Sequence, residues 1–323
     1  MRVIVAKTFV FLFLFKLLDI SLFLALLPLD QRTVVQQGAS NEGDLGPLYR
    51  GGMREDMVAF GDSRIRYQLD AGILKQTTGL STYNFAWEAT PFDQQFFTLE
   101  EYLDRNRRPR AVIFEADPLS LDPAFFKFQT LWFRPYAGYS ARVADRIFTS
   151  VTEKYANRFV RCLAFRGRVL PILRSAFSSR PVSGNSPAGT VPILRGHPPR
   201  GLKLDFKSFH INEARKQGFR QLAELAAKNG FVLFLISTPE YRHDQRLNAR
   251  DADAAYHFFE SLAKAYKTTF YLNYARDARF INQDDLWFDA QHLNRDGMVP
   301  FSRIVGADIA ARFGDGTNKI LTR

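Results

Sequence analysis

Two short stretches far apart in the chain carry residue types that together could perform nucleophilic catalysis. The first is Gly61-Asp62-Ser63, where the apolar run 57–61 ends and a polar, helix-compatible segment follows. This pattern predicts a tight turn from a strand into a helix, with the Ser63 hydroxyl at the carboxyl end of the strand. Amide groups at a helix start can stabilise an oxyanion, so the turn suits a nucleophile. Because Gly-Asp-Ser is also ordinary turn chemistry, in which Asp62 holds the turn, it needs a partner before it indicates catalysis.

The second stretch supplies that partner, in the segment Asp289-Ala290-Gln291-His292. A carboxylate three positions before a histidine can accept a hydrogen bond from the imidazole, which fixes the tautomer and stabilises the imidazolium formed during proton transfer. We therefore expect Ser63 to be the nucleophile, His292 the general base and acid, and Asp289 the orienting carboxylate.

The order of elements around these stretches predicts the fold class. Short apolar runs alternate with longer amphipathic segments, which is typical of a doubly wound, flavodoxin-like α/β sandwich with a parallel sheet. We expect strands at 57–61, 81–86, 110–116, 231–237 and 269–274, and helices at 64–77, 91–105, 212–228, 251–265 and 294–313.

In this setting Gly61-Asp62-Ser63 and Asp289-x-x-His292 resemble the first and last motif blocks of the SGNH, or GDSL-type, hydrolase superfamily. The resemblance covers roughly 56–313. It implies an SGNH-type fold, the same three catalytic roles, and an oxyanion hole to which the Ser63 amide contributes.

The middle blocks depart from that family. Its glycine after the second strand is missing from the segment 84–88, and its asparagine after the third strand is missing from 115–118. As substitute oxyanion donors we consider the amides of Ala86 and Trp87 and the side chain of Asn84. Weakened middle blocks and an amino-terminal span also occur in proteins that this layout resembles, namely the alginate acetylation proteins and the D-alanine transfer protein of teichoic acid synthesis.

The amino-terminal residues 1–29 are apolar over a length that can span a bilayer as a helix. Lys16 and Asp19 interrupt the run but share a helix face, so each can neutralise the other. We expect a retained signal anchor, with a cleaved signal peptide as the alternative. Basic residues precede the span and none follows before Arg32, which predicts a cytoplasmic amino terminus and an extracytoplasmic domain, periplasmic in a Gram-negative cell.

The remaining organisation follows from composition. A polar, glycine-rich linker is expected at 30–55, the α/β domain at 56–313 and a tail at 314–323. A basic region at 120–210 interrupts the alternation, and we interpret it as an inserted lid whose part 178–200 is a loop. From 120 to 207 there are fifteen Lys and Arg against four acids, an excess equal to the net charge of +11.

The basic insertion has three open interpretations: it binds an anionic polysaccharide, faces anionic lipid headgroups, or is a solvated surface. Arg64, Asp117, Trp132 and Arg134 are candidates for substrate binding, although an arginine such as Arg64 is more often simply exposed on its helix. Nucleic acid is disfavoured as a partner because the anchor places the domain outside the cytoplasm. The histidines lack metal-ligand spacing and there is a single cysteine, so we expect no metal and no cofactor.

These observations lead to one hypothesis and one alternative. The hypothesis is a membrane-anchored, extracytoplasmic serine esterase or O-acyltransferase that acts through an acyl-enzyme on acyl groups, in the first place acetyl groups, of a cell-surface polysaccharide. A membrane-bound acyltransferase is a candidate partner. The alternative is a catalytically degenerate SGNH domain that binds polysaccharide or scaffolds an export complex, which the missing middle blocks favour.

Overall fold

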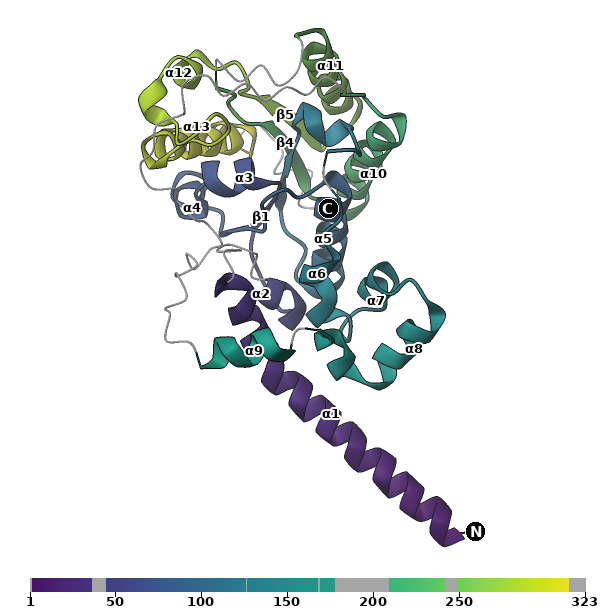
Figure 1. The fold of residues 1–323 in the computed structure, drawn as a ribbon. Helices are drawn as coiled ribbons and strands as arrows, with labels where there is room; N and C mark the ends of the chain where they lie inside the picture. The colour runs from purple at the N-terminus through teal and green to yellow at the C-terminus, as the bar shows by residue number, and fades with distance from the viewer. Residues whose placement is uncertain are drawn as a thin grey trace. The chain divides into compact units, whose positions relative to one another are not determined.

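The computed structural model describes residues 2–36, 45–125, 127–167, 169–177, 209–241 and 249–313. The expected loop 178–200 and tail 314–323 lie outside these residues. The chain divides into two compact units (Figure 1). One comprises Met1–Tyr49 and Gln129–Gly184, and the other comprises Arg50–Phe128 and Asn185–Arg323.

The second unit is built on a five-stranded parallel sheet in the order β2-β1-β3-β4-β5. This is the flavodoxin-like order of a doubly wound fold, as the alternation of elements predicts. Met57 is paired with Thr82 on one side and with Ala111 on the other, which fixes the register of the first three strands. The strands are β1 (Met57–Phe60), β2 (Thr82–Asn84), β3 (Ala111–Glu115), β4 (Val232–Ser237) and β5 (Thr269–Asn273).

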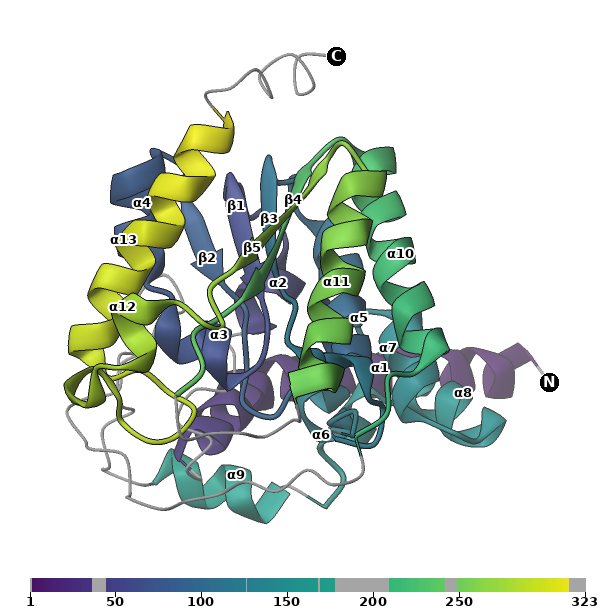
Figure 2. The same ribbon diagram turned by 90° about the horizontal axis from the view of Figure 1, so that it is seen from above.

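Helices cover both faces of this sheet (Figure 2). On one face lie α4 (Ala71–Thr78) and α13 (Arg295–Arg312), and on the other lie α5 (Phe92–Arg105), α10 (Glu213–Asn229) and α11 (Ala249–Ala265). Shorter elements complete the unit: α3 (Ser63–Gln68), the 3-10 turns η1 (Pro118–Leu121) and η4 (Asp284–Leu286), and α12 (Ala278–Ile281).

Burial follows from the pleat of the strands, because successive side chains point to opposite faces. Met57 and Ala59 of β1 pack into a core with Trp287 and Phe301. On the opposite face, Phe60 stacks on aromatic neighbours such as Phe85. All residues of β1, β3 and β4 are buried, which explains why these strands appear in the sequence as continuous apolar runs.

One expected helix is in fact two. The segment 64–77 forms α3 and α4, separated by the extended residue Leu69. Asp70 caps α4 by accepting a hydrogen bond from the Ile73 amide at 2.9 Å. An aspartate at this position favours a new helix start over continuation of the old helix.

The first unit contains the long apolar helix α1 (Arg2–Gln36), which extends beyond the expected span 1–29, and α2 (Leu45–Arg50) within the segment 30–55 expected as a linker. Segments of the basic region supply its other elements. These are α6 (Thr130–Phe133), η2 (Arg134–Tyr136), α7 (Ala141–Ile147), α8 (Val151–Phe159), η3 (Arg161–Phe165) and α9 (Val169–Ala176).

Candidate active site

The turn at Ser63 is shaped by its neighbours on both sides. β1 ends at Phe60, and a Cβ on Gly61 would lie only 2.4 Å from Cγ1 of Ile65, so the close approach of strand and helix requires a glycine. Asp62 is the N-cap of α3, and its carboxylate accepts a hydrogen bond from the Arg64 amide at 2.8 Å. Ser63 is therefore the first residue of α3, at the carboxyl edge of the sheet.

The loop between η4 and α13 presents Asp289 and His292. An antiparallel bridge between Trp287 and Leu293 closes this loop, and the Phe288 amide donates to the His292 carbonyl at 2.8 Å. The buried Trp287 fixes the loop to the core. The loop thus has a defined shape although it is neither helix nor strand.

The structure brings Ser63, His292 and Asp289 into one hydrogen-bonded chain. Nε2 of His292 lies 2.8 Å from Oγ of Ser63, and Nδ1 of His292 lies 2.8 Å from Oδ2 of Asp289. The side chains of His292 and Asp289 are 16% and 33% exposed, so a substrate can reach the site from solvent. A serine, an imidazole and a carboxylate in this order have the geometry of an activated nucleophile.

Asp289 is held as a carboxylate. Burial opposes its ionisation, but the hydrogen bond and charge of His292 and the amides of Gln291 and His292 outweigh burial, so the pKa of Asp289 lies below its ordinary value. These two amides donate to Oδ1 at 2.7 and 2.8 Å. Near neutral pH, Asp289 can therefore accept a hydrogen bond from Nδ1–H of His292, which keeps the proton on Nδ1 and leaves Nε2 unprotonated to receive the proton of Ser63.

The substitute oxyanion donors expected from the sequence are engaged elsewhere. The Ala86 amide donates to the Asn84 side chain at 3.0 Å, and the Trp87 amide donates to the Gly61 carbonyl at 3.0 Å. The Asn84 side-chain amide donates to the carbonyls of Ile65 and Leu69. All three donors thus have other acceptors in this structure, and their role in an oxyanion hole stays a prediction.

The Ser63 amide remains as a donor at the turn. Within the part of the chain that the structure describes, it donates to no protein acceptor, whereas the next amide, that of Arg64, is held by Asp62.

Arg64 and Asp117 do not have the exposure expected of substrate-binding residues. They form an ion pair with each other, and they are 2% and 4% exposed. Glu115 lies next to this ion pair, with its Oε1 at 3.5 Å from Nη2 of Arg64. The usual exposure of helix arginines does not hold here because the carboxylate of Asp117, just after β3, pairs with the buried guanidinium.

Glu115 was not anticipated from the sequence, although a glutamate that ends an apolar strand could have drawn attention to it. Its Oε2 accepts hydrogen bonds from the Asp62 amide at 2.6 Å and from the Gln95 side chain at 3.2 Å. Burial and the charge on Asp62 raise the pKa of Glu115 well above its ordinary value, although Arg64 opposes this. Glu115 thus ties β3 and α5 to the turn that carries Ser63.

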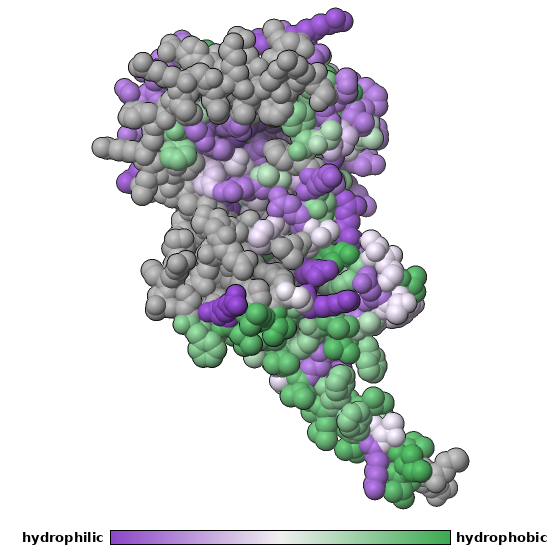
Figure 3. Space-filling model, in the orientation of Figure 1, coloured by the Kyte–Doolittle hydropathy of each residue, from purple (hydrophilic) through white to green (hydrophobic). Residues whose placement is uncertain are grey.

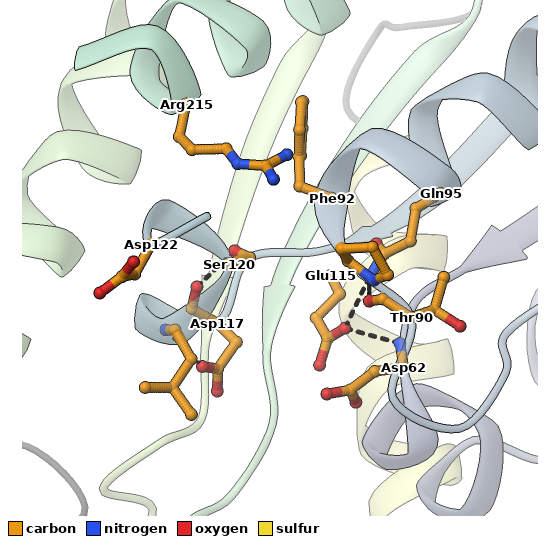
Figure 4. Close-up of a pocket in the computed structure, with 11 residues that line it drawn as sticks. Asp62, Thr90, Phe92, Gln95, Glu115, Asp117, Ser120, Asp122 and Arg215 are labelled. Carbon is orange, nitrogen blue, oxygen red and sulfur yellow. Dashed lines mark hydrogen bonds between the residues drawn. The ribbon is translucent and has the colours of Figure 1, made fainter. Parts of the chain in front are cut away.

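A pocket lies beside this turn, between the carboxyl ends of β1 and β3 (Figure 4). Asp62 and Glu115 point toward one another on one side, and Asp117 and Asp122 lie on the other, with Arg215 of α10 above them. The strand order reverses at this edge, which is where ligands bind in doubly wound folds.

Two further residues support the histidine loop. Tyr67 meets the His292 ring edge-on, with 5.5 Å between ring centroids, and its hydroxyl is hydrogen-bonded to Glu88. The Gln68 side chain donates to the Gln291 carbonyl at 2.8 Å. Both lie on α3, so the helix that begins with Ser63 also positions its partner.

Trp132 and Arg134 belong to the other compact unit, so their role in substrate binding stays a prediction. In the described ranges, no group of three His, Cys, Asp or Glu side chains is arranged to hold a metal ion.

Comparisons with known proteins give one family model and a set of distantly similar solved structures. The model of a family described as a protein of unknown function, DUF1574, matches residues 53–184, and no curated protein matches the chain. Among solved structures, a protein of the G-D-S-L family from Desulfitobacterium hafniense DCB-2 is 12% identical, with 77% of this chain and 97% of that chain covered and a TM-score of 0.40.

Two acetylesterases are similar at slightly lower identity and TM-score. Est24, a carbohydrate acetylesterase from Sinorhizobium meliloti, is 10% identical, with 80% and 100% of the two chains covered and a TM-score of 0.38. A catalytic mutant of Axe2, an acetylxylan esterase from Geobacillus stearothermophilus, is 10% identical, with 79% and 93% covered and a TM-score of 0.37. The structural neighbours are GDSL-type hydrolases and acetylesterases, while the resemblance to the alginate and D-alanine proteins stays a prediction. At these scores we base the function on the geometry of the site.

Proposed function

We propose that the protein is a serine esterase or O-acyltransferase with Ser63 as its nucleophile. The observation that carries this proposal is the unbroken chain of two 2.8 Å contacts from Ser63 Oγ through the His292 ring to Asp289. In the proposed reaction, Oγ attacks the carbonyl carbon of an acyl ester and its proton passes to Nε2. The Ser63 amide stabilises the oxyanion, and the tetrahedral intermediate collapses to an acyl-enzyme as His292 returns the proton to the departing alkoxide.

Water or a sugar hydroxyl then resolves the acyl-enzyme, with His292 again serving as base. The assay that tests the chemistry is hydrolysis of p-nitrophenyl acetate by the purified full-length protein. Ser63→Ala should abolish hydrolysis, and Ser261→Ala, which alters an exposed serine on α11, should leave it unchanged. Hydrolysis that survives Ser63→Ala would contradict the assignment.

For the natural substrate we propose an O-acetylated cell-surface polysaccharide. The concentration of positive charge in 120–207 supports an anionic polymer, and α1 would hold the enzyme at the membrane. Incubation with an acetylated polysaccharide distinguishes the two reactions: release of free acetate indicates an esterase, and movement of labelled acetyl groups onto a deacetylated polymer indicates a transferase.

We further propose that α1 is a single-pass anchor with the rest of the chain extracytoplasmic. Its segment Val3–Leu29 is long and apolar enough to cross a membrane, with a mean hydropathy of 2.4, a property that signal sequences share. A reporter that is active only outside the cytoplasm, fused after Arg323, should be active. Activity of a cytoplasm-dependent reporter at the same position would contradict this topology.

The engaged amides of Ala86 and Trp87 favour one alternative, a degenerate domain that binds polysaccharide without turning it over. That alternative predicts polysaccharide binding that is unaffected by Ser63→Ala and no acetyl release from any acetylated polymer. Turnover by the parent protein would exclude it.

A further inference from the structure

The part of α1 in which every side chain is exposed is shorter than a bilayer is thick. All thirteen residues from Val3 to Phe15 are exposed, which at 1.5 Å per residue is about 20 Å of helix. The hydrocarbon core of a bilayer is about 30 Å thick and requires about 20 helical residues. If α1 crosses the membrane as proposed, its exposed part accounts for only about 20 Å of the hydrocarbon core. The remaining roughly 10 Å must be crossed by later turns of α1, which also pack against other segments of the protein.

The next turns of α1 are covered on one side by segments of the same unit. Asp19 is 5% exposed and accepts hydrogen bonds from the amides of Arg161 and Cys162 at 2.9 and 3.0 Å. Lys16 pairs with Asp19 at 3.2 Å and donates to the Phe159 carbonyl at 2.6 Å. The two charges within the apolar helix are therefore compensated by η3 and the end of α8.

Apolar packing extends this contact along α1. Phe23 is fully buried against Phe165, with 5.3 Å between ring centroids, and Ile172 of α9 belongs to the same cluster. Over this part α1 still has exposed apolar side chains on its other side, among them Leu18 at 65% and Leu22 at 47%. Protein thus covers one side of these turns and leaves apolar side chains exposed on the other side.

The segments that pack on α1 expose large apolar side chains of their own. On α8, Val151, Tyr155 and Phe159 recur every four residues and are 68%, 66% and 58% exposed, so they form one stripe. On α9 and just after it, exposed side chains include Leu170 at 59% and Phe177 at 89%. In Figure 3, hydrophobic residues, drawn in green, make up most of the visible surface of α1 and continue onto the adjoining part of the unit.

Exposed arginines accompany these apolar side chains. Arg158 lies in the last turn of α8 next to Phe159, Arg166 lies between η3 and α9, and Arg174 lies in the last turn of α9. Apolar faces bordered by Lys and Arg are typical of helices that lie in the membrane interface, buried about 5–10 Å, and bind anionic lipids. This insertion depth agrees with the roughly 10 Å of bilayer that must be crossed by the turns of α1 that pack against η3, α8 and α9.

We infer that α8, η3 and α9 form a second membrane contact, in which their exposed apolar side chains insert into the anionic bilayer surface that α1 crosses. This inference rests on the proposed anchoring by α1. The occupant of the exposed apolar stripe is then lipid rather than a second copy of the chain or another protein. Parts of the basic insertion would serve to hold the first unit on the membrane.

Depth-dependent fluorescence quenching tests the inference on the full-length protein. Single cysteines are introduced by Tyr155→Cys and Leu170→Cys, with Glu153→Cys as a matched control on α8 outside the stripe and Phe11→Cys as a reference on α1. Each variant is labelled with a maleimide dye near neutral pH and reconstituted into phosphatidylcholine vesicles with or without phosphatidylglycerol. The native thiol labels slowly, because burial and the bond to Asp19 raise the pKa of Cys162 to about 11, and the unsubstituted protein measures this background.

We expect the dyes at positions 155 and 170 to be quenched by lipid-borne nitroxide and shielded from aqueous iodide, as the dye at position 11 is. The dye at 153 should respond in the opposite way. Phosphatidylglycerol should increase lipid quenching at 170, and equal quenching in neutral vesicles would overturn the role given to the arginines. Iodide quenching at 155 and 170, with position 11 in lipid, would overturn the surface contact while leaving the anchor intact. Iodide quenching at all positions would overturn the anchor as well, and shielding from both quenchers would show that another protein covers the stripe.

Discussion

Replacement of Asp289 by asparagine should disable the site while preserving its shape. Oδ1 of Asp289 is held by the amides of Gln291 and His292 at 2.7 and 2.8 Å, and Oδ2 lies 2.8 Å from Nδ1 of His292. In Asp289→Asn, the oxygen stays with the two amides and the NH2 group takes the place of Oδ2. An NH2 group can only donate, so Nδ1 must become an acceptor and the imidazole proton moves to Nε2.

That tautomer cannot take the proton of Ser63. In serine enzymes with this arrangement the same exchange lowers kcat about 10⁴-fold, which is about 5 kcal/mol of transition-state stabilisation. The assay is kcat/KM for p-nitrophenyl acetate, with far-UV circular dichroism and thermal unfolding to verify the fold. Asp285→Asn, at an exposed position in the same loop region, is the matched control and should retain parent activity. Asp289→Asn activity within tenfold of the parent would refute the role of the carboxylate.

Three further predictions concern the turn and its support. Gly61→Ala should lower the free energy of unfolding by about 1–3 kcal/mol, because its Cβ would overlap Ile65; an unchanged urea midpoint would count against the close approach. Arg64→Met should cost about 3–5 kcal/mol by leaving buried Asp117 unpaired, and the double variant Arg64→Met/Asp117→Asn should recover part of the loss; no recovery in urea unfolding would contradict the ion pair. Glu115→Gln should remove a pH dependence of the free energy of unfolding, because the Glu115 carboxyl group keeps its proton in the folded chain and releases it in the unfolded chain above about pH 4.5. Relative to this variant, the free energy of unfolding of the parent should fall as the pH rises from about 4.5 to the pKa of Glu115 in the folded chain, by up to about 1.4 kcal/mol per pH unit. Parallel curves of unfolding free energy against pH for the two proteins would refute the raised pKa.

Much of the fold could be predicted because each buried strand leaves a local signal. The apolar run of β4 and the Asn229-Gly230 end of α10 both appear in the sequence where the structure has them. The split between α3 and α4 was missed because it depends on the cap at Asp70. No single segment of the sequence determines the order of the strands in the sheet, but the alternation of strands and helices restricts that order to a few doubly wound arrangements.

The three central site residues could be proposed from local motifs, whereas their surroundings depend on tertiary contacts. Asp289 and His292 are three positions apart, so their contact could be predicted from the sequence alone. The contact of Ser63 with His292 joins residues 229 positions apart and depends on the sheet topology. No local signal shows that the Asn84 amide is committed to carbonyls of α3 and the segment after it. The burial of Arg64 was likewise missed, because it depends on an ion pair with Asp117, which follows β3.

The most direct test of the central claim is to identify the residue modified by a fluorophosphonate probe. The probe reacts with a serine only when a base activates it, so peptide mass spectrometry of the labelled full-length protein reports the nucleophile without knowledge of the natural substrate. We predict a single labelled site at Ser63, and loss of labelling in His292→Ala. Labelling at another serine, or labelling of Ser63 that persists without His292, would contradict the account.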